Sequence, residues 1–94
     1  MSALLQISVD LTYQCRADVI VTDLQDELVL LDPGSVEMFS LNAVGRAVWL
    51  ALPTSPAHAA EQIVAAFDVD EDTALEDTMA LLQELYGAGL VESA

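Results

Sequence analysis

The sequence predicts an α+β domain of winged helix-turn-helix-like order, with a three-stranded antiparallel sheet followed by three helices. Two observations predict this fold. Short segments rich in Val, Leu and Phe alternate with turn residues in the first half of the chain, and three amphipathic segments with capping residues fill the second half. Because 94 residues suffice for one domain with a thin core, we expect residues 1–94 to form a single domain.

The expected strands contain β-branched and large apolar residues, and turn formers separate them. Joined in chain order, they form an antiparallel meander. The strands are expected at 18–24, 27–32 and 35–41, with turns at Gln25-Asp26 and Pro33-Gly34.

The N-terminal segment, residues 1–15, has a strand period, because Ile7, Val9, Leu11 and Tyr13 alternate with other residues. This segment forms either an extra strand or a loosely held arm. The pattern does not say which strand it would pair with.

Each expected helix follows a residue that can cap it. Asn42 precedes a helix over 43–52, and Ser55 caps a second helix that has Pro56 at its first position. Asp70 caps a third helix, which ends at Gly87 and is followed by a short extended tail.

The chain is strongly acidic, with two Arg, no Lys and 16 carboxylates, which give a net charge of −14. Affinity for nucleic acid and for anionic membranes depends on cations, so we expect neither as a partner. The charge indicates either solubility in a salt-rich or acidic-proteome setting, or a basic or amphipathic partner attracted by the field.

Residue types for catalysis or metal binding are scarce. Cys15 and His58 are the only Cys and the only His, and a structural zinc site requires about four such ligands. No nucleophile–base motif or Gly-rich phosphate loop is present, so we expect no enzyme, cofactor or metal. Without a signal-like N-terminus or an apolar stretch of about 18 residues, a cytoplasmic location is expected.

Strand 35–41 is the first candidate site. In a meander it lies at the sheet edge, unless the segment 1–15 covers it, and free N–H and C=O groups at such an edge can accept an extended peptide as a further strand. Alternatively, the edge is protected by Glu37, by twist or by pairing in a dimer. The residues expected to contact a peptide here are Val36, Glu37, Met38, Phe39, Ser40 and Leu41.

One flank of the third helix is the second candidate site. Met79 and Tyr86 lie about 80–100° from the centre of its apolar stripe, and they either form the wall of a groove or widen the core. Met and Tyr suit an adaptable binding surface. The residues expected to contact a peptide here are Asp72, Leu75, Glu76, Met79, Leu82, Gln83 and Tyr86.

The segment LVLLDPGSVEMFSLNAVGRAVW, residues 28–49, resembles the PqqD family. The resemblance rests on the Leu31-Asp32 turn, the following short strand, and then Leu41-Asn42, Gly45 and Trp49. It extends over residues 18–92, where the acidic cap at 67–70 and the closing helix are also similar to the family pattern.

The resemblance implies a RiPP recognition element. Such a domain binds the leader region of a ribosomally synthesised precursor peptide by strand addition and presents it to a modifying enzyme. The chain is similar to the leader-binding half of a split lasso-peptide B protein, which implies a leader peptidase and an asparagine-synthetase-like cyclase as partners. It is also similar to PqqD itself, which implies a radical-SAM partner in cofactor biosynthesis.

A leader with Lys or Arg beside apolar anchors would suit Glu37, Asp72 and Glu76. We expect the adaptor to be a monomer or a weak homodimer. The rival interpretation is a structural or regulatory winged-helix protein that dimerises through its third strand or third helix.

Overall fold

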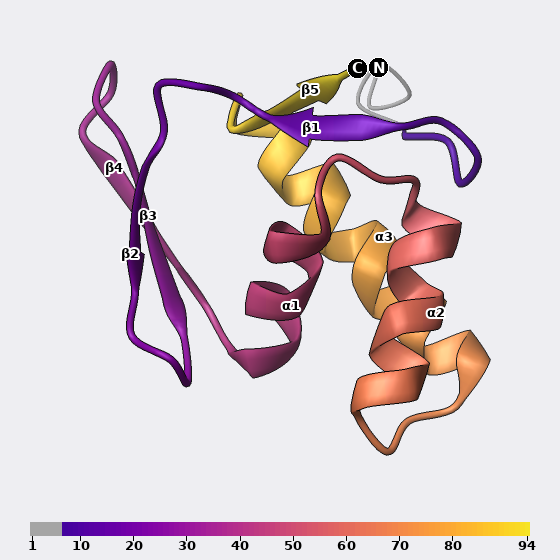
Figure 1. The fold of residues 1–94 in the computed structure, drawn as a ribbon. Coiled ribbons are helices and arrows are strands. Elements are labelled where there is room, and N and C mark those ends of the chain that lie inside the picture. The colour runs from indigo at the N-terminus through magenta and orange to yellow at the C-terminus, as the bar shows by residue number, and fades with distance from the viewer. Residues whose placement is uncertain (1–6) are drawn as a thin grey trace.

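The computed structural model describes residues 7–94 as an α+β fold with a small sheet standing to one side of three helices (Figure 1). This sheet confirms the predicted meander. It contains β2 (Ile20–Asp23), β3 (Leu28–Asp32) and β4 (Glu37–Leu41), paired antiparallel in the order β2-β3-β4.

The two faces of this sheet are set by its register. Leu28 lies opposite Leu41 and Leu30 opposite Phe39, so these four side chains share one face. Leu28, Leu30 and Leu41 are buried, which identifies this face as the inner one. The alternate positions point away from the helices.

The helices are α1 (Ala43–Ala51), α2 (Pro56–Ala66) and α3 (Glu71–Gly87). Each begins after the capping residue that the sequence predicted, because a side-chain oxygen there satisfies a free N–H of the first turn. Asn42 accepts from the N–H of Gly45 at 2.9 Å, Ser55 from that of His58 at 3.2 Å, and Asp70 from that of Thr73 at 2.7 Å.

A second, two-stranded sheet joins the two ends of the described chain. It pairs β1 (Tyr13–Cys15) antiparallel with β5 (Val91–Ser93), so part of the segment 1–15 is a strand and the C-terminal tail is its partner. Residues 1–6 of that segment lie outside the described residues. Tyr13 also exchanges two backbone hydrogen bonds with Thr54, of 2.9 and 3.0 Å, which fasten β1 to the α1–α2 connection.

The core lies between the inner face of β3 and the three helices. Leu28 and Leu30 from β3 belong to one buried cluster with side chains from every helix and from the start of β5. Burial of each such side chain contributes about 1.5–3 kcal/mol, so this cluster holds sheet and helices in one arrangement. The buried helix and β5 members include Val48, Trp49, Ile63, Leu82, Leu85 and Val91.

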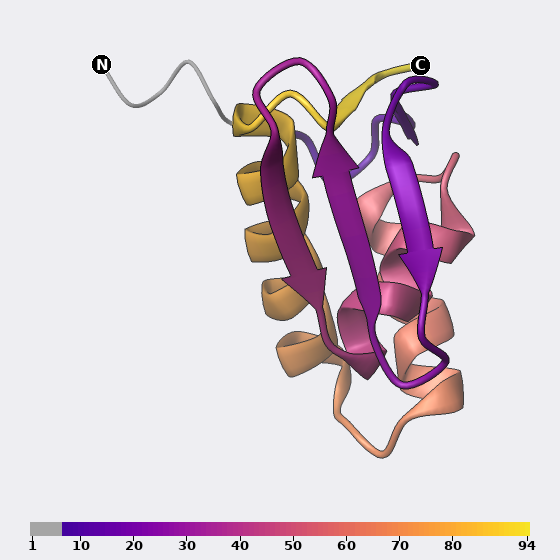
Figure 2. The same cartoon turned by 90° about the vertical axis from the view of Figure 1, so that its left-hand side faces the viewer.

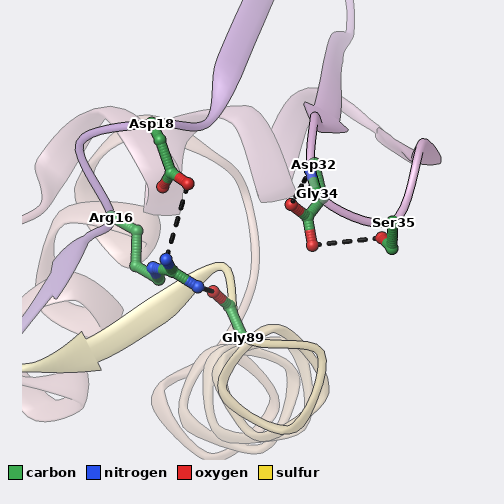
Figure 3. A network of polar contacts seen from close by, with 6 residues as sticks. All are labelled: Arg16, Asp18, Asp32, Gly34, Ser35 and Gly89. Carbon is green, nitrogen blue, oxygen red and sulfur yellow. Dashed lines mark hydrogen bonds and ion pairs between the residues drawn. The ribbon is translucent and has the colours of Figure 1, made fainter.

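Polar contacts fasten two connections at the sheet (Figure 3). Arg16 donates to the carbonyl of Gly89 at 3.1 Å and contacts Asp18 at 3.4 Å, which ties the β1–β2 connection to the end of α3. In the β3–β4 turn, Asp32 accepts from the N–H of Gly34 at 3.0 Å and from the hydroxyl of Ser35 at 3.1 Å. The two bonds to Asp32 hold the turn through which the chain enters β4.

Candidate functional site

The outer edge of β4 is unpaired within residues 7–94. β4 bonds only to β3, because β1 pairs with β5 instead. The described part of the N-terminal segment therefore leaves this edge open. An open edge presents a row of free backbone donors and acceptors to an added strand.

A groove runs beside this edge, between β4 and α3. Figure 2 shows α3 alongside β4 and behind the plane of the sheet. The groove has a volume of about 630 Å³ and is lined by residues of both elements and of the start of α1. Its lining from β4 is Met38, Phe39, Ser40 and Leu41; its lining from α3 is Asp77, Ala80, Leu81, Glu84 and Leu85.

The floor of the groove depends on a close approach at Gly45. A Cβ atom placed on Gly45 would lie 3.0 Å from Leu41 Cβ and 3.5 Å from Leu81 Cδ2. Because a glycine has no side chain, the first turn of α1 fits between β4 and α3. The residue thereby sets the separation of the two groove walls.

The α3 wall is apolar in the middle and acidic at both ends. Asp77 and Glu84 lie seven residues apart, which is about 10.5 Å along the helix axis. Ala80 and Leu81 lie between them. The groove thus offers an apolar seat flanked by two exposed carboxylates.

Neither arginine of the chain neutralises these carboxylates. Arg46 makes a forked ion pair with Asp23, with both contacts at 2.8 Å, and Arg16 binds Asp18 and the Gly89 carbonyl. The Arg46 bond, with a smaller contribution from the N–H of Gln25, lowers the pKa of the Asp23 carboxyl to about 2. Arg46 therefore fixes α1 against β2, and the groove keeps its negative charge.

Four of the six predicted β4-segment residues, Met38 to Leu41, line the groove. By the alternation of the strand, Phe39 and Leu41 face it, whereas Met38 and Ser40 border it at the open edge with their side chains toward the outer face. Val36 and Glu37 lie at the hairpin turn and the start of β4. Val36 has a φ of 59°, in the left-handed region, and is 75% exposed. Peptide contact at all six positions stays a prediction.

The predicted α3 wall lies on the side of the helix away from the β4 groove, and peptide contact at its residues stays a prediction. Met79 and Tyr86 do not line the groove beside β4 but pack against the core, so they widen it, which was one of the two alternatives. Tyr86 meets Tyr13 edge-to-face at 5.9 Å, and Leu82 is fully buried. The other predicted residues, Asp72, Leu75, Glu76 and Gln83, line a second depression together with Met79, and Ala80 borders both this depression and the groove.

The sequence did not indicate which side of α3 faces β4, because a buried helical stripe has two flanks. Thr78 and Leu85 mark the buried stripe of α3, and Leu81 and Met79 lie on opposite sides of it. The sequence favoured the flank with the larger apolar residues. The flank that faces β4 carries a small residue between two acids, Asp77, Ala80 and Glu84, a pattern that resembles an ordinary solvated face.

Residues 7–94 contain neither a metal-binding cluster nor a membrane-spanning helix. No group of three or more His, Cys, Asp or Glu in this range is arranged to hold a metal ion. No helix in the same range is long and apolar enough to cross a membrane.

Comparison with known proteins yields one family and several solved structures. The family model of Coenzyme PQQ synthesis protein D (PqqD) matches residues 27–91. No curated protein matches the chain.

Two similar structures contain leader peptides. The structure of TbiB1 in complex with the TbiA(beta) leader peptide is 30% identical, with coverage of 84% of this chain and 94% of that one and a TM-score of 0.76. A lasso peptide synthetase B1 complexed with its leader peptide is 27% identical, with coverage of 85% and 96% and a TM-score of 0.74.

A third similar structure is the PqqD truncation of Methylobacterium extorquens PqqCD, a stand-alone RiPP recognition element solved in solution. It is 20% identical, with coverage of 94% of this chain and 96% of that one and a TM-score of 0.74. At this identity the similarity is one of fold.

Proposed function

The chain belongs to the PqqD family, and on this premise we propose that it is a RiPP recognition element. It binds the leader region of a ribosomally synthesised precursor peptide and presents it to a maturation enzyme, without catalysis or a cofactor of its own. The observation that carries this proposal is the open edge of β4 beside a groove.

The leader adds to β4 as a further strand. Its main chain bonds to the free N–H and C=O groups of Glu37–Leu41, and its alternate side chains point into the groove. Five residues of extended peptide span about 17 Å, which covers the length of β4. Main-chain bonds supply affinity for any extended segment, so the groove must supply selectivity.

The residues that line the groove indicate which side chains the leader carries. An apolar anchor fits between Phe39 and Leu81, and the carboxylates of Asp77 and Glu84 suit Lys or Arg on either side of it. Inward-facing positions two residues apart are separated by about 6.7 Å. A leader with an apolar residue at one position and a basic residue two positions before or after it matches this spacing.

The lasso-peptide role is favoured over the PqqD role. The two leader-bound structures, TbiB1 and a lasso peptide synthetase B1, are 30% and 27% identical to this chain, against 20% for the PqqD truncation. The implied partners are a leader peptidase and a cyclase. A PqqD-type chaperone for a radical-SAM enzyme is the alternative.

We also propose that the protein is cytoplasmic and that it forms a single domain with a winged helix-turn-helix-like arrangement. The order of a small antiparallel sheet followed by three helices supports this arrangement. Acidic residues such as Asp77 and Glu84 on α3 argue against a DNA-reading role for that helix.

Calorimetric titration with a synthetic leader peptide that carries an apolar residue and a basic residue two positions away tests the proposal. We expect a 1:1 complex that weakens about two- to five-fold for each of Asp77→Asn and Glu84→Gln, the range for exposed charge pairs. Asp68→Asn, an exposed carboxylate that lines neither depression, serves as the matched control and should bind as the wild type does. Asp72→Asn and Glu76→Gln test the other flank of α3, and a loss of affinity there in place of one at Asp77 and Glu84 would assign the leader to that flank. Absence of heat with this leader, or a stable dimer that seals the β4 edge in light scattering, would contradict the proposal.

A further inference from the structure

The face of the β2-β3-β4 sheet that points away from the helices is apolar. Its register places Ile20, Leu31 and Met38 in one row across the three strands, with Val29 in the next row. Ile20 and Met38 are 51% and 68% exposed. In Figure 2 this face is toward the viewer, and none of the described elements covers it. The free face of an antiparallel sheet is usually polar, so an apolar one marks an interaction surface.

Val36 lies beside this surface, in the hairpin turn that precedes β4. It is β-branched yet has a φ of 59°, a conformation that costs such a residue about 1–2 kcal/mol. Its side chain is 75% exposed and therefore contributes little packing to the fold. Backbone strain that no packing interaction offsets is typical of functional positions. Here the function would be to expose an apolar side chain to a partner.

The charge of the chain narrows the choice of occupant. A second copy would bring another net charge of −14, and an anionic membrane would be repelled in the same way. Carboxylates border the face: Glu27 accepts from the hydroxyl of Ser40 at 3.0 Å, and Glu37 begins β4. These features fit a different protein, with an apolar centre and Lys or Arg around it.

We propose that this outer face, defined by Ile20, Val29, Leu31 and Met38 and bordered by Val36, is where the maturation enzyme docks. The inference rests on the proposed function. A leader added to β4 would point every second side chain outward, next to Met38, and would extend the row into a fourth strand. The enzyme thus contacts a surface built from both adaptor and leader, and it binds the loaded adaptor more tightly than the empty one.

The test uses variants on the outer face that are outside the groove. The double variant Ile20→Thr, Leu31→Thr removes apolar area and keeps strand-forming residues. Leu50→Gln is the matched control, because Leu50 is 53% exposed on α1 and Ile20 is 51% exposed. The single variant Ile20→Thr is the milder version, and circular-dichroism melts verify that each protein is folded.

Two affinities are measured for each protein. Calorimetry gives the affinity for the leader peptide, and biolayer interferometry gives the affinity for a purified leader peptidase from the same organism, with and without leader. We expect unchanged leader affinity in all variants, and a loss of about ten-fold or more in peptidase affinity for the double variant, as for central interface residues. Leu50→Gln should behave as the wild type does. The leader should strengthen peptidase binding to the wild type.

The outcomes separate this inference from the proposed function. If the wild type does not bind its leader, the proposed function fails. If the leader binds but the double variant keeps full peptidase affinity, the docking face is refuted and the leader-binding function stands. A micromolar homodimer that the double variant dissociates would assign the face to a second copy and would also refute the inference.

Discussion

Replacing Ala80 by Trp is expected to close the groove while leaving the fold intact. Ala80 is exposed on α3 and lines the groove between Asp77 and Glu84. Ala65 is also exposed and helical, but it lies on α2 and lines no part of this groove. Ala65→Trp therefore carries the same helix-propensity cost, up to about 0.7 kcal/mol, without the steric block.

The magnitude follows from what the groove would bury. A leader anchor that enters the apolar seat gains about 1.5–3 kcal/mol from burial of its side chain. If an indole occupies the seat, that gain is lost while the main-chain bonds to β4 remain. Because about 1.4 kcal/mol corresponds to a tenfold change in dissociation constant, Ala80→Trp should weaken leader binding about ten- to 150-fold.

Fluorescence anisotropy of a labelled leader peptide measures this effect, and circular-dichroism melts measure stability. Ala65→Trp should bind as tightly as the wild type, and both variants should melt at similar temperatures. The reasoning is refuted if Ala80→Trp binds the leader normally, or if Ala65→Trp loses the same affinity.

Three further predictions concern the frame of the site. Gly45→Val should overpack the contact with Leu41, lower stability by about 1–3 kcal/mol and weaken leader binding, which melts and anisotropy would show. Val36→Asn should relieve the left-handed strain and raise the melting temperature by about 4–8 °C, and an unchanged or lower temperature would count against the strain. Asp23, whose pKa of about 2 lies below the usual 3.8 because of Arg46, stabilises the fold above about pH 4, and this stabilisation is lost as the pH falls through about 2. The difference in melting temperature between wild type and Asp23→Asn should thus be constant from about pH 7 to pH 5 and shrink below about pH 4; a constant difference down to about pH 2 would contradict the ion pair.

Local chemistry explains why much of the fold could be predicted from the sequence. A helix cap such as Asn42 or Asp70 acts on the N–H groups of the next turn, and Pro33-Gly34 bends the chain within a few residues. These interactions involve neighbours in the sequence, so the bounds of the helices and the meander follow from them.

What could not be predicted depends on partners far along the chain. The alternation around Tyr13 indicates a strand, but its pairing with Ser93 arises only when the helices bring the two ends together. Likewise, the periodicity of α3 defines a buried stripe but not which flank faces β4. The packing of α3 on α2 and on the core determines which flank faces β4. The sequence pattern therefore did not identify Ala80 and Leu81 as groove residues.

Hydrogen exchange of the backbone amides, with and without the leader peptide, tests the central claim most directly. A strand added to β4 should protect those amides of Glu37–Leu41 that do not bond to β3, while the amides at the free edge of β2 (Ile20–Asp23) exchange at an unchanged rate. Leader binding that leaves β4 exchange unchanged, or that protects β2 instead, would contradict strand addition at this edge.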